Sequence, residues 1–253
     1  MNIDYKWTVE HEDMHNKFNA ECVNINNFKL NSLMKIIVQN CPYDDGMKHL
    51  EFITQNYKQY FDLIDFDLLK YYDTFGSQGD HSLILGVSPK VISYIKESLI
   101  FLVEYVIPRK ISEIYNLMVI GGGYGMEVVI LKHIADKLNI NIKNIISIDM
   151  ENVVKLQNMF FEHCSQQEKN INQICKAYTP DYNVDNIDMI YSNCCLSELS
   201  PIVNYDYFNR YVDKSKYFFI VWTRVFADIP EYYNKNISER YILLGNNTLL
   251  TNL

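Results

Sequence analysis

Several features that would point to a function by themselves are missing from this chain of 253 residues. Its six cysteines are scattered and form no C-x-x-C pair, which excludes an obvious zinc site or disulfide framework. Reduced thiols are typical of a cytoplasmic protein, and we expect that location. There is no run of lysine and arginine, and the formal net charge is −8, so we expect no nucleic-acid partner.

A long uninterrupted apolar run is also absent. The most apolar stretch, residues 91–107, contains Lys96, Glu97 and Glu104, so it is not expected to span a membrane. The first ten residues are polar and do not resemble a signal peptide. We therefore expect no membrane partner. Hydrophobic residues nevertheless make up 48% of the chain, which is enough for a sizeable core.

The first third of the chain has the apolar spacing of helices. Helices are predicted around residues 30–38, 44–61 and 65–72, and Ser88-Pro89 is expected to begin another, with Ser88 as N-cap. We expect residues 1–85 to form an N-terminal helical cap region and residues 86–253 to form the main domain.

From residue 117 onward, short apolar strands alternate with helical segments. This pattern predicts βαβ units, and hence a parallel Rossmann-like α/β sheet covered on both faces. The expected strands are residues 117–120, 144–149, 171–177, 187–192 and 217–223, with two closing strands at 241–244 and 248–253.

A glycine-rich loop follows the first of these strands. Its residues, Gly121-Gly122-Gly123-Tyr124-Gly125, lie where a parallel sheet binds its ligand. A dinucleotide loop has the spacing G-x-G-x-x-G, but here Met126 follows Gly125. The G-x-G-x-G spacing suits a methionine and adenosine moiety lying over the loop. A tight strand-to-helix turn with no ligand is the alternative.

An acid, Asp149, ends the second strand. A carboxylate there can accept both ribose hydroxyls of a nucleoside. The alternative is a helix N-cap for the segment that begins near Asn152. Glu151 is a second ribose candidate, although it also fits an acid placed to favour the helix dipole.

Hydrogen-bonding side chains follow the fourth strand, in the segment 192–200. This loop is expected where an acceptor would meet the ligand, and it contains the carboxylate of Glu198. That residue could equally be a solvated loop acid or a capping partner of the next helix.

Four segments in this order, VIGGGYGMEVVIL, ISIDMENVVKLQNMF, IDMIYSNCCLSELS and FFIVWTR, resemble the sugar O-methyltransferase family of class I methyltransferases. The likeness covers roughly residues 70–225. Its more specific part is the loop with Asn193, Leu196, Ser197 and Glu198. The resemblance implies a class I methyltransferase sheet, S-adenosylmethionine as cofactor, and methyl transfer to a sugar hydroxyl in glycan biosynthesis.

The resemblance and the residues together give a predicted site. The expected cofactor-binding residues are Gly121, Gly122, Gly123, Tyr124, Gly125, Asp149, Met150 and Asn193. We expect His81 and Glu198 to be catalytic, with His81 as the base. Asp80, Ser197 and Arg224 are expected to bind the acceptor, a small molecule or glycan, and no metal site is expected. His81 could instead be an ordinary surface histidine, and Arg224 a member of a structural ion pair.

Two departures from the family pattern keep other functions open. Many class I enzymes carry an acid two residues before the first loop glycine, where this chain has Val119. Glu127 or a loop carbonyl could replace it. The late strand ends Trp222-Thr223-Arg224, with Thr in place of Asn. A methyltransferase for another small molecule, and an idle fold that binds a partner, remain alternatives, and a homodimer is expected from fold analogy alone.

Overall fold

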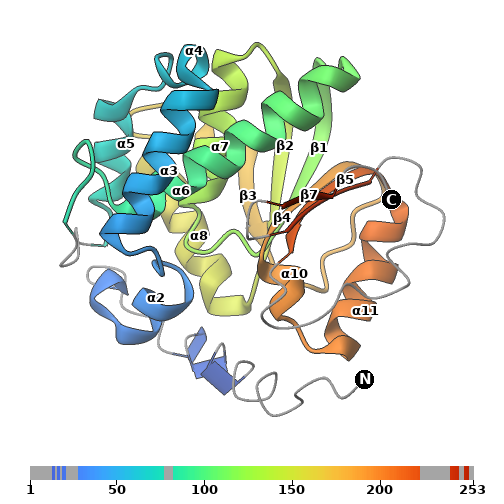
Figure 1. Cartoon of the computed structure of the whole chain (residues 1–253). Helices are drawn as coiled ribbons and strands as arrows, with labels where there is room; N and C mark the ends of the chain where they lie inside the picture. The colour runs from blue at the N-terminus through green and yellow to red at the C-terminus, as the bar shows by residue number, and fades with distance from the viewer. Residues whose placement is uncertain are drawn as a thin grey trace.

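The computed structural model describes residues 13–14, 16–17, 19–20, 28–76, 82–222, 240–244 and 248–250. Their main feature is a seven-stranded sheet in the order β3-β2-β1-β4-β5-β6-β7 (Figure 1). Neighbouring strands are parallel except for β6 and β7. The strands are β1 (Glu113–Ile120), β2 (Asn141–Ile148), β3 (Cys175–Tyr178), β4 (Ile187–Asn193), β5 (Ser215–Trp222), β6 (Arg240–Leu244) and β7 (Thr248–Leu250).

This strand order is that of a doubly wound sheet. From β1 the chain adds β2 and β3 on one side, and it then crosses back to add β4 and the later strands on the other side, so that the strand order reverses between β1 and β4. The predicted Rossmann-like α/β fold is therefore confirmed, and the two closing strands are present. A ligand of such a sheet binds beyond the carboxyl ends of the strands, at the point of reversal.

Helices cover both faces of the sheet (Figure 1). They are α2 (Ser32–Ile37), α3 (Tyr43–Asn56), α4 (Lys58–Phe61), α5 (Phe66–Asp73), α6 (Pro89–Leu99), α7 (Met126–Lys137), α8 (Glu151–Cys164), α9 (Ile171–Ile174), α10 (Cys195–Glu198) and α11 (Pro201–Arg210). A π-helix, η2 (Ile100–Val106), extends α6, and the 3₁₀ turns are η1 (Phe28–Leu30), η3 (Ile107–Arg109) and η4 (Val212–Lys214).

Alternating side chains of β1 divide the apolar core into two layers. Leu117 and Val119 belong to the cluster that also contains residues of α6, α7 and α8. Met118 and Ile120 belong to the cluster on the opposite face, under α11. A strand buried on both faces reads as one continuous apolar run, as residues 117–120 do.

Three sequence-based predictions about elements were wrong in detail. The expected strand at 171–177 begins as α9 and becomes β3 only at Cys175, because Asn170 has a left-handed backbone and starts a helical turn. The expected helix at 44–61 is broken at Tyr57, whose φ is −130°. Ser88 is the N-cap residue of α6, but its side chain caps nothing and bonds to Asp73 instead.

The N-terminal helices share the larger core with the sheet. Phe28, Met34, Ile53 and Leu69 lie in the same buried cluster as β1 and α7. The N-terminal helices are thus part of the main core. This core continues across residue 85, and both the cap formed by residues 1–85 and the domain boundary there stay predictions.

One buried ion pair fastens the start of this region. Lys29 Nζ lies 2.9 Å from Asp73 Oδ1, and both side chains are almost fully buried. Ser88 donates its backbone N–H to Asp73 Oδ2 over 2.7 Å, and the Tyr124 hydroxyl donates to Asp73 Oδ1 over 3.4 Å. This one carboxylate therefore joins η1, the end of α5, the start of α6 and the glycine loop.

Among the helices that the structure describes, none is long and apolar enough to cross a membrane.

Candidate functional site

The glycine loop follows β1 at the point where the sheet reverses direction. Gly121 and Gly125 have φ values of 78° and 104°, a left-handed backbone that favours glycine. A methyl group at Gly121 would also lie only 2.3 Å from Cys195 Cβ. The glycine at 121 is therefore required both by its backbone and by the close approach of the segment after β4.

The N-terminal region covers the loop. A Cβ at Gly123 would lie 2.9 Å from Val38 Cγ1, just after α2. Tyr94 of α6 donates a hydrogen bond to the Val38 carbonyl over 3.4 Å. The ring of Tyr124 is buried in the core against Phe28, and the cofactor contact expected of this residue stays a prediction.

Asp149 lies directly after β2, beside the loop. Its Oδ1 accepts a hydrogen bond from the Met150 N–H (2.9 Å), and its Oδ2 accepts one from Gln157 Nε2 (3.0 Å). Burial raises the pKa of this carboxyl to about 7, although the two hydrogen bonds act in the opposite direction. Gln157 Nε2 also donates to the Gly123 carbonyl over 2.7 Å, so one amide holds the loop and the acid together.

Asp149 is not the cap of the following helix. The N-cap residue of α8 is Met150, which offers no side-chain oxygen. The Asn152 N–H instead donates to Asn19 Oδ1 over 2.9 Å, and Asn152 Nδ2 donates to the Asn19 carbonyl over 2.8 Å. The N-terminal segment thus caps α8, which leaves Asp149 directed towards the loop.

Glu127, in the first turn of α7, reaches the end of β4. The Tyr191 hydroxyl and Asn193 Nδ2 both donate to its Oε1, over 2.8 and 2.6 Å. Burial raises the pKa of Glu127 to about 7, against the lowering effect of these two hydrogen bonds. Asn193, one of the expected cofactor residues, is therefore oriented by a buried carboxyl.

The segment after β4 was expected to be a loop, but it forms the short helix α10. Cys194 precedes it with φ 65°, so the chain turns sharply there. The Ser197 hydroxyl is buried and donates to the Cys194 carbonyl over 2.6 Å. Glu198 ends the helix half-buried. The acceptor-binding role of Ser197 stays a prediction, and its hydroxyl is engaged with the main chain in this structure.

Negative charges of three acids act on the thiol of Cys195. Its pKa is raised well above the ordinary value, first by burial and then by the charges of Asp149, Glu198, Cys194 and Glu127. The thiol that touches Gly121 is therefore within electrostatic reach of the acids that follow β2 and β4 and of the acid of α7. Such a group of carboxylates favours a positively charged ligand.

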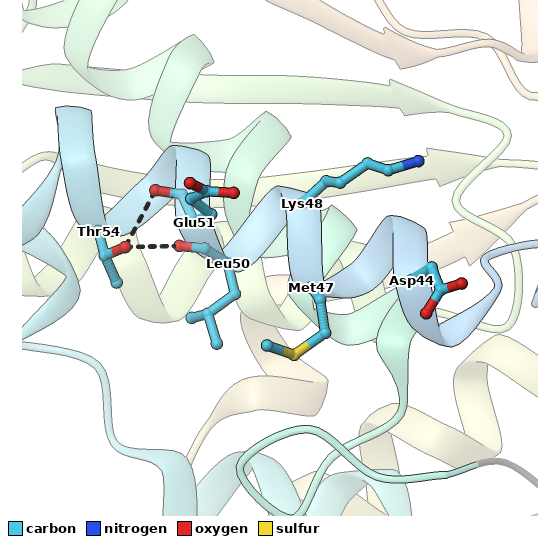
Figure 2. A pocket seen from close by; sticks show the side chains of 6 residues that line it. All are labelled: Asp44, Met47, Lys48, Leu50, Glu51 and Thr54. Atoms are coloured by element: carbon cyan, nitrogen blue, oxygen red, sulfur yellow. Dashed lines mark hydrogen bonds between the residues drawn. The ribbon is translucent and has the colours of Figure 1, made fainter.

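Three expected acceptor-site residues, Asp80, His81 and Arg224, lie outside the described residues. Within the described part of the chain, no group of three or more His, Cys, Asp and Glu could hold a metal ion. Figure 2 shows a separate open pocket along the exposed side of α3, where Thr54 Oγ1 donates to the Leu50 and Glu51 carbonyls. None of the residues that line it was expected in the site.

Two residues of the site were not identified from the sequence. Gln157 is fully buried on the apolar face of α8, between Val153 and Phe160. A lone amide in an apolar stripe was the available signal. The sequence contains no signal for the role of Tyr191, because a tyrosine in a buried strand looks like any other core aromatic residue.

Comparisons with known proteins give only distant likenesses. No family model matches the chain, and no curated protein matches it significantly. A candidate methyltransferase from Burkholderia thailandensis, solved with S-adenosyl-homocysteine bound, is 13% identical with a TM-score of 0.29, over 42% of this chain and 24% of that one. A candidate RNA methyltransferase from Pyrococcus horikoshii is 15% identical with a TM-score of 0.37, over 56% and 62% of the two chains.

A candidate O-methyltransferase from Nostoc punctiforme is 15% identical with a TM-score of 0.32, over 68% of this chain and 50% of that one. In all three cases the match spans less than two thirds of the other protein's length. Likenesses at these identities and TM-scores carry no argument about function.

Proposed function

We propose that this protein is an S-adenosylmethionine-dependent methyltransferase that methylates a hydroxyl group of a sugar. One observation carries the proposal. The glycine loop after β1 and the acid after β2 are held side by side by Gln157, whose Nε2 donates to the Gly123 carbonyl and to Asp149 Oδ2. They lie at the point of reversal of the sheet, where such folds bind nucleotides.

The polar groups beside the loop fit this cofactor. Gly121 and Gly123 let Cys195 and Val38 lie directly against the loop, which brings the segment after β4 and the end of α2 beside the acid that follows β2. Ser147 Oγ and Gln157 Oε1 are buried near the loop with no partner among the described residues, which leaves polar groups to be satisfied. Asp149 can accept from two ribose hydroxyls.

The charges fit as well. S-adenosylmethionine carries a sulfonium and an ammonium group, and the negative charges of Asp149, Glu198 and Glu127 all act on the thiol beside Gly121. A dinucleotide would instead need a third glycine where Met126 is fully buried. These charges support a cationic ligand over a pyrophosphate.

The bound cofactor supplies a methyl group activated by the sulfonium. The protein's own contribution is to hold the acceptor oxygen in line and to exclude water, which gives much of the rate. A sugar hydroxyl is a weak nucleophile, so a general base adds roughly 10²–10⁴-fold. We propose His81 as that base, Glu198 as a residue that positions the sugar, and Asp80, Ser197 and Arg224 as acceptor-binding residues.

Calorimetry tests the cofactor first. S-adenosylhomocysteine should bind the wild-type protein, and Asp149→Ala should weaken binding by about tenfold to a hundredfold, because two hydroxyls lose a charged acceptor. Glu151→Ala is the matched control, since that side chain is 71% exposed and pairs with Lys155. Equal affinity of Asp149→Ala and wild type would remove Asp149 from the site.

The acceptor is tested with labelled cofactor and a panel of nucleotide sugars and glycans. His81→Asn should lower turnover with little change in cofactor affinity, and wild-type turnover should rise with pH through a pKa near ~6.5. Glu198→Gln should also lower turnover. If both variants turned over at the wild-type rate, neither residue would be catalytic.

A further inference from the structure

Glu127 has one carboxylate oxygen that accepts no hydrogen bond from the residues that the structure describes. The side chain is 3% exposed, and both of its hydrogen bonds, from Tyr191 and Asn193, reach Oε1. From the described residues, Oε2 accepts no hydrogen bond. A buried carboxylate with an unused oxygen is costly to keep unless a ligand satisfies it.

No described lysine, arginine or histidine forms an ion pair with this acid, although the charge of Lys90 acts to lower its pKa. The ion pairs formed within the described part of the chain include none to Glu127. An acid in the first turn of a helix often serves only the helix dipole. Here the donors come from β4, which directs the carboxylate to the sheet's carboxyl edge and away from the backbone N–H groups of α7.

The strand before the glycine loop provides no acid of its own. Val119 is fully buried and packs in the core beneath α6 and α7. Glu127 reaches the same edge from the other side of the loop, where Asn193 donates a hydrogen bond to it. An ammonium group, with three N–H donors and a positive charge, is the complement of such a carboxylate.

We infer that Glu127 binds the α-ammonium group at the amino-acid end of the cofactor, with Tyr191 and Asn193 holding its carboxylate in place. The inference rests on the proposed function. Glu127 would make the contact to the ammonium group that Val119 of β1, an apolar residue, cannot make. Tyr191 and Asn193 are positioning residues, because they act through Glu127.

The test separates the two ends of the ligand. Calorimetry would measure wild type and Glu127→Gln with S-adenosylhomocysteine, with its analogue lacking the α-amino group, and with 5′-methylthioadenosine, which lacks the amino-acid end. Glu127→Gln should bind S-adenosylhomocysteine about tenfold to a hundredfold more weakly and 5′-methylthioadenosine unchanged. Wild-type protein should bind the deaminated analogue more weakly than S-adenosylhomocysteine by a similar factor. Glu127→Gln should bind these two ligands with equal affinity. Glu151→Gln, an exposed acid, should behave as wild type.

Each outcome has one meaning. Equal weakening of S-adenosylhomocysteine and 5′-methylthioadenosine in Glu127→Gln would show a structural role and overturn the inference, while the proposed function would stand. Wild-type protein that bound S-adenosylhomocysteine and its deaminated analogue equally would also overturn it, even if the variant failed to fold. Wild-type protein that bound none of the three nucleosides would overturn the proposed function and the inference together.

Discussion

Glu127→Gln should stabilise the ligand-free protein at neutral and alkaline pH while it weakens cofactor binding. Burial raises the pKa of this carboxyl from 4.5 to about 7 in the folded protein. An acid whose folded pKa is raised holds its proton more tightly in the folded state. Stability is therefore lost as pH rises from about 4.5 towards 7, and the loss stays constant above that range.

The size of the effect follows from the two pKa values. At 1.36 kcal/mol for each pH unit, the interval from 4.5 to about 7 corresponds to ~3 kcal/mol of unfolding free energy. Glutamine cannot ionise and keeps an oxygen for the Tyr191 hydroxyl and Asn193. The Glu127→Gln variant should therefore keep most of the unfolding free energy that wild type loses when Glu127 ionises.

Urea unfolding of both proteins at pH 5 and pH 8 measures the effect. The stability of Glu127→Gln relative to wild type should rise by about 2 kcal/mol between these pH values, because the variant escapes the ionisation cost. Asp149, whose pKa is also raised to about 7, is present in both proteins, so its contribution cancels in the comparison. A difference that stayed constant with pH, or that fell towards pH 8, would refute the reasoning.

Three further outcomes are expected. Gln157→Leu should weaken S-adenosylhomocysteine binding by about tenfold in calorimetry, because the loop carbonyl and the ribose acid lose their shared donor; unchanged affinity would show that this amide does not order the site. Lys29→Met should lower the urea-unfolding free energy by about 3–5 kcal/mol, because Asp73 is left buried without its cation, whereas Lys155→Met, in an exposed pair, should change little. Gly121→Ala should abolish binding and lower the melting temperature, since its φ is 78° and the added methyl group meets Cys195 at 2.3 Å; a variant with wild-type melting and affinity would contradict the assigned close contact.

The sequence predicted the fold because β1, β2, β4 and β5 each contain a buried apolar run. The positions of Gly121 and Asp149 at strand ends follow from the same pattern, and their proximity follows from the parallel pairing of β1 and β2. The short segment at 171–177 was misassigned because four helical residues leave too few turns to show a period.

The contacts within the site were less predictable. The hydrogen bonds to Glu127 join residues 64 and 66 positions apart, and no local pattern reports such a pairing. The cap of α8 by Asn19 is equally invisible, because the helix's own N-cap position holds Met150. Sequence patterns report which face of an element is buried, whereas the direction of a polar side chain depends on what the finished fold brings beside it.

That cap has a consequence for the order of events during synthesis. Asn19 and Asn152 are 133 positions apart in the chain, although Asn152 donates hydrogen bonds to both the side chain and the main-chain carbonyl of Asn19. At a translation rate of about 5–20 residues per second, Asn19 is made roughly 7 to 27 s before its partner. Throughout that interval the nascent N-terminal segment has no α8 to bind. We therefore expect the nucleoside end of the site to become native only after residue 152 has been made.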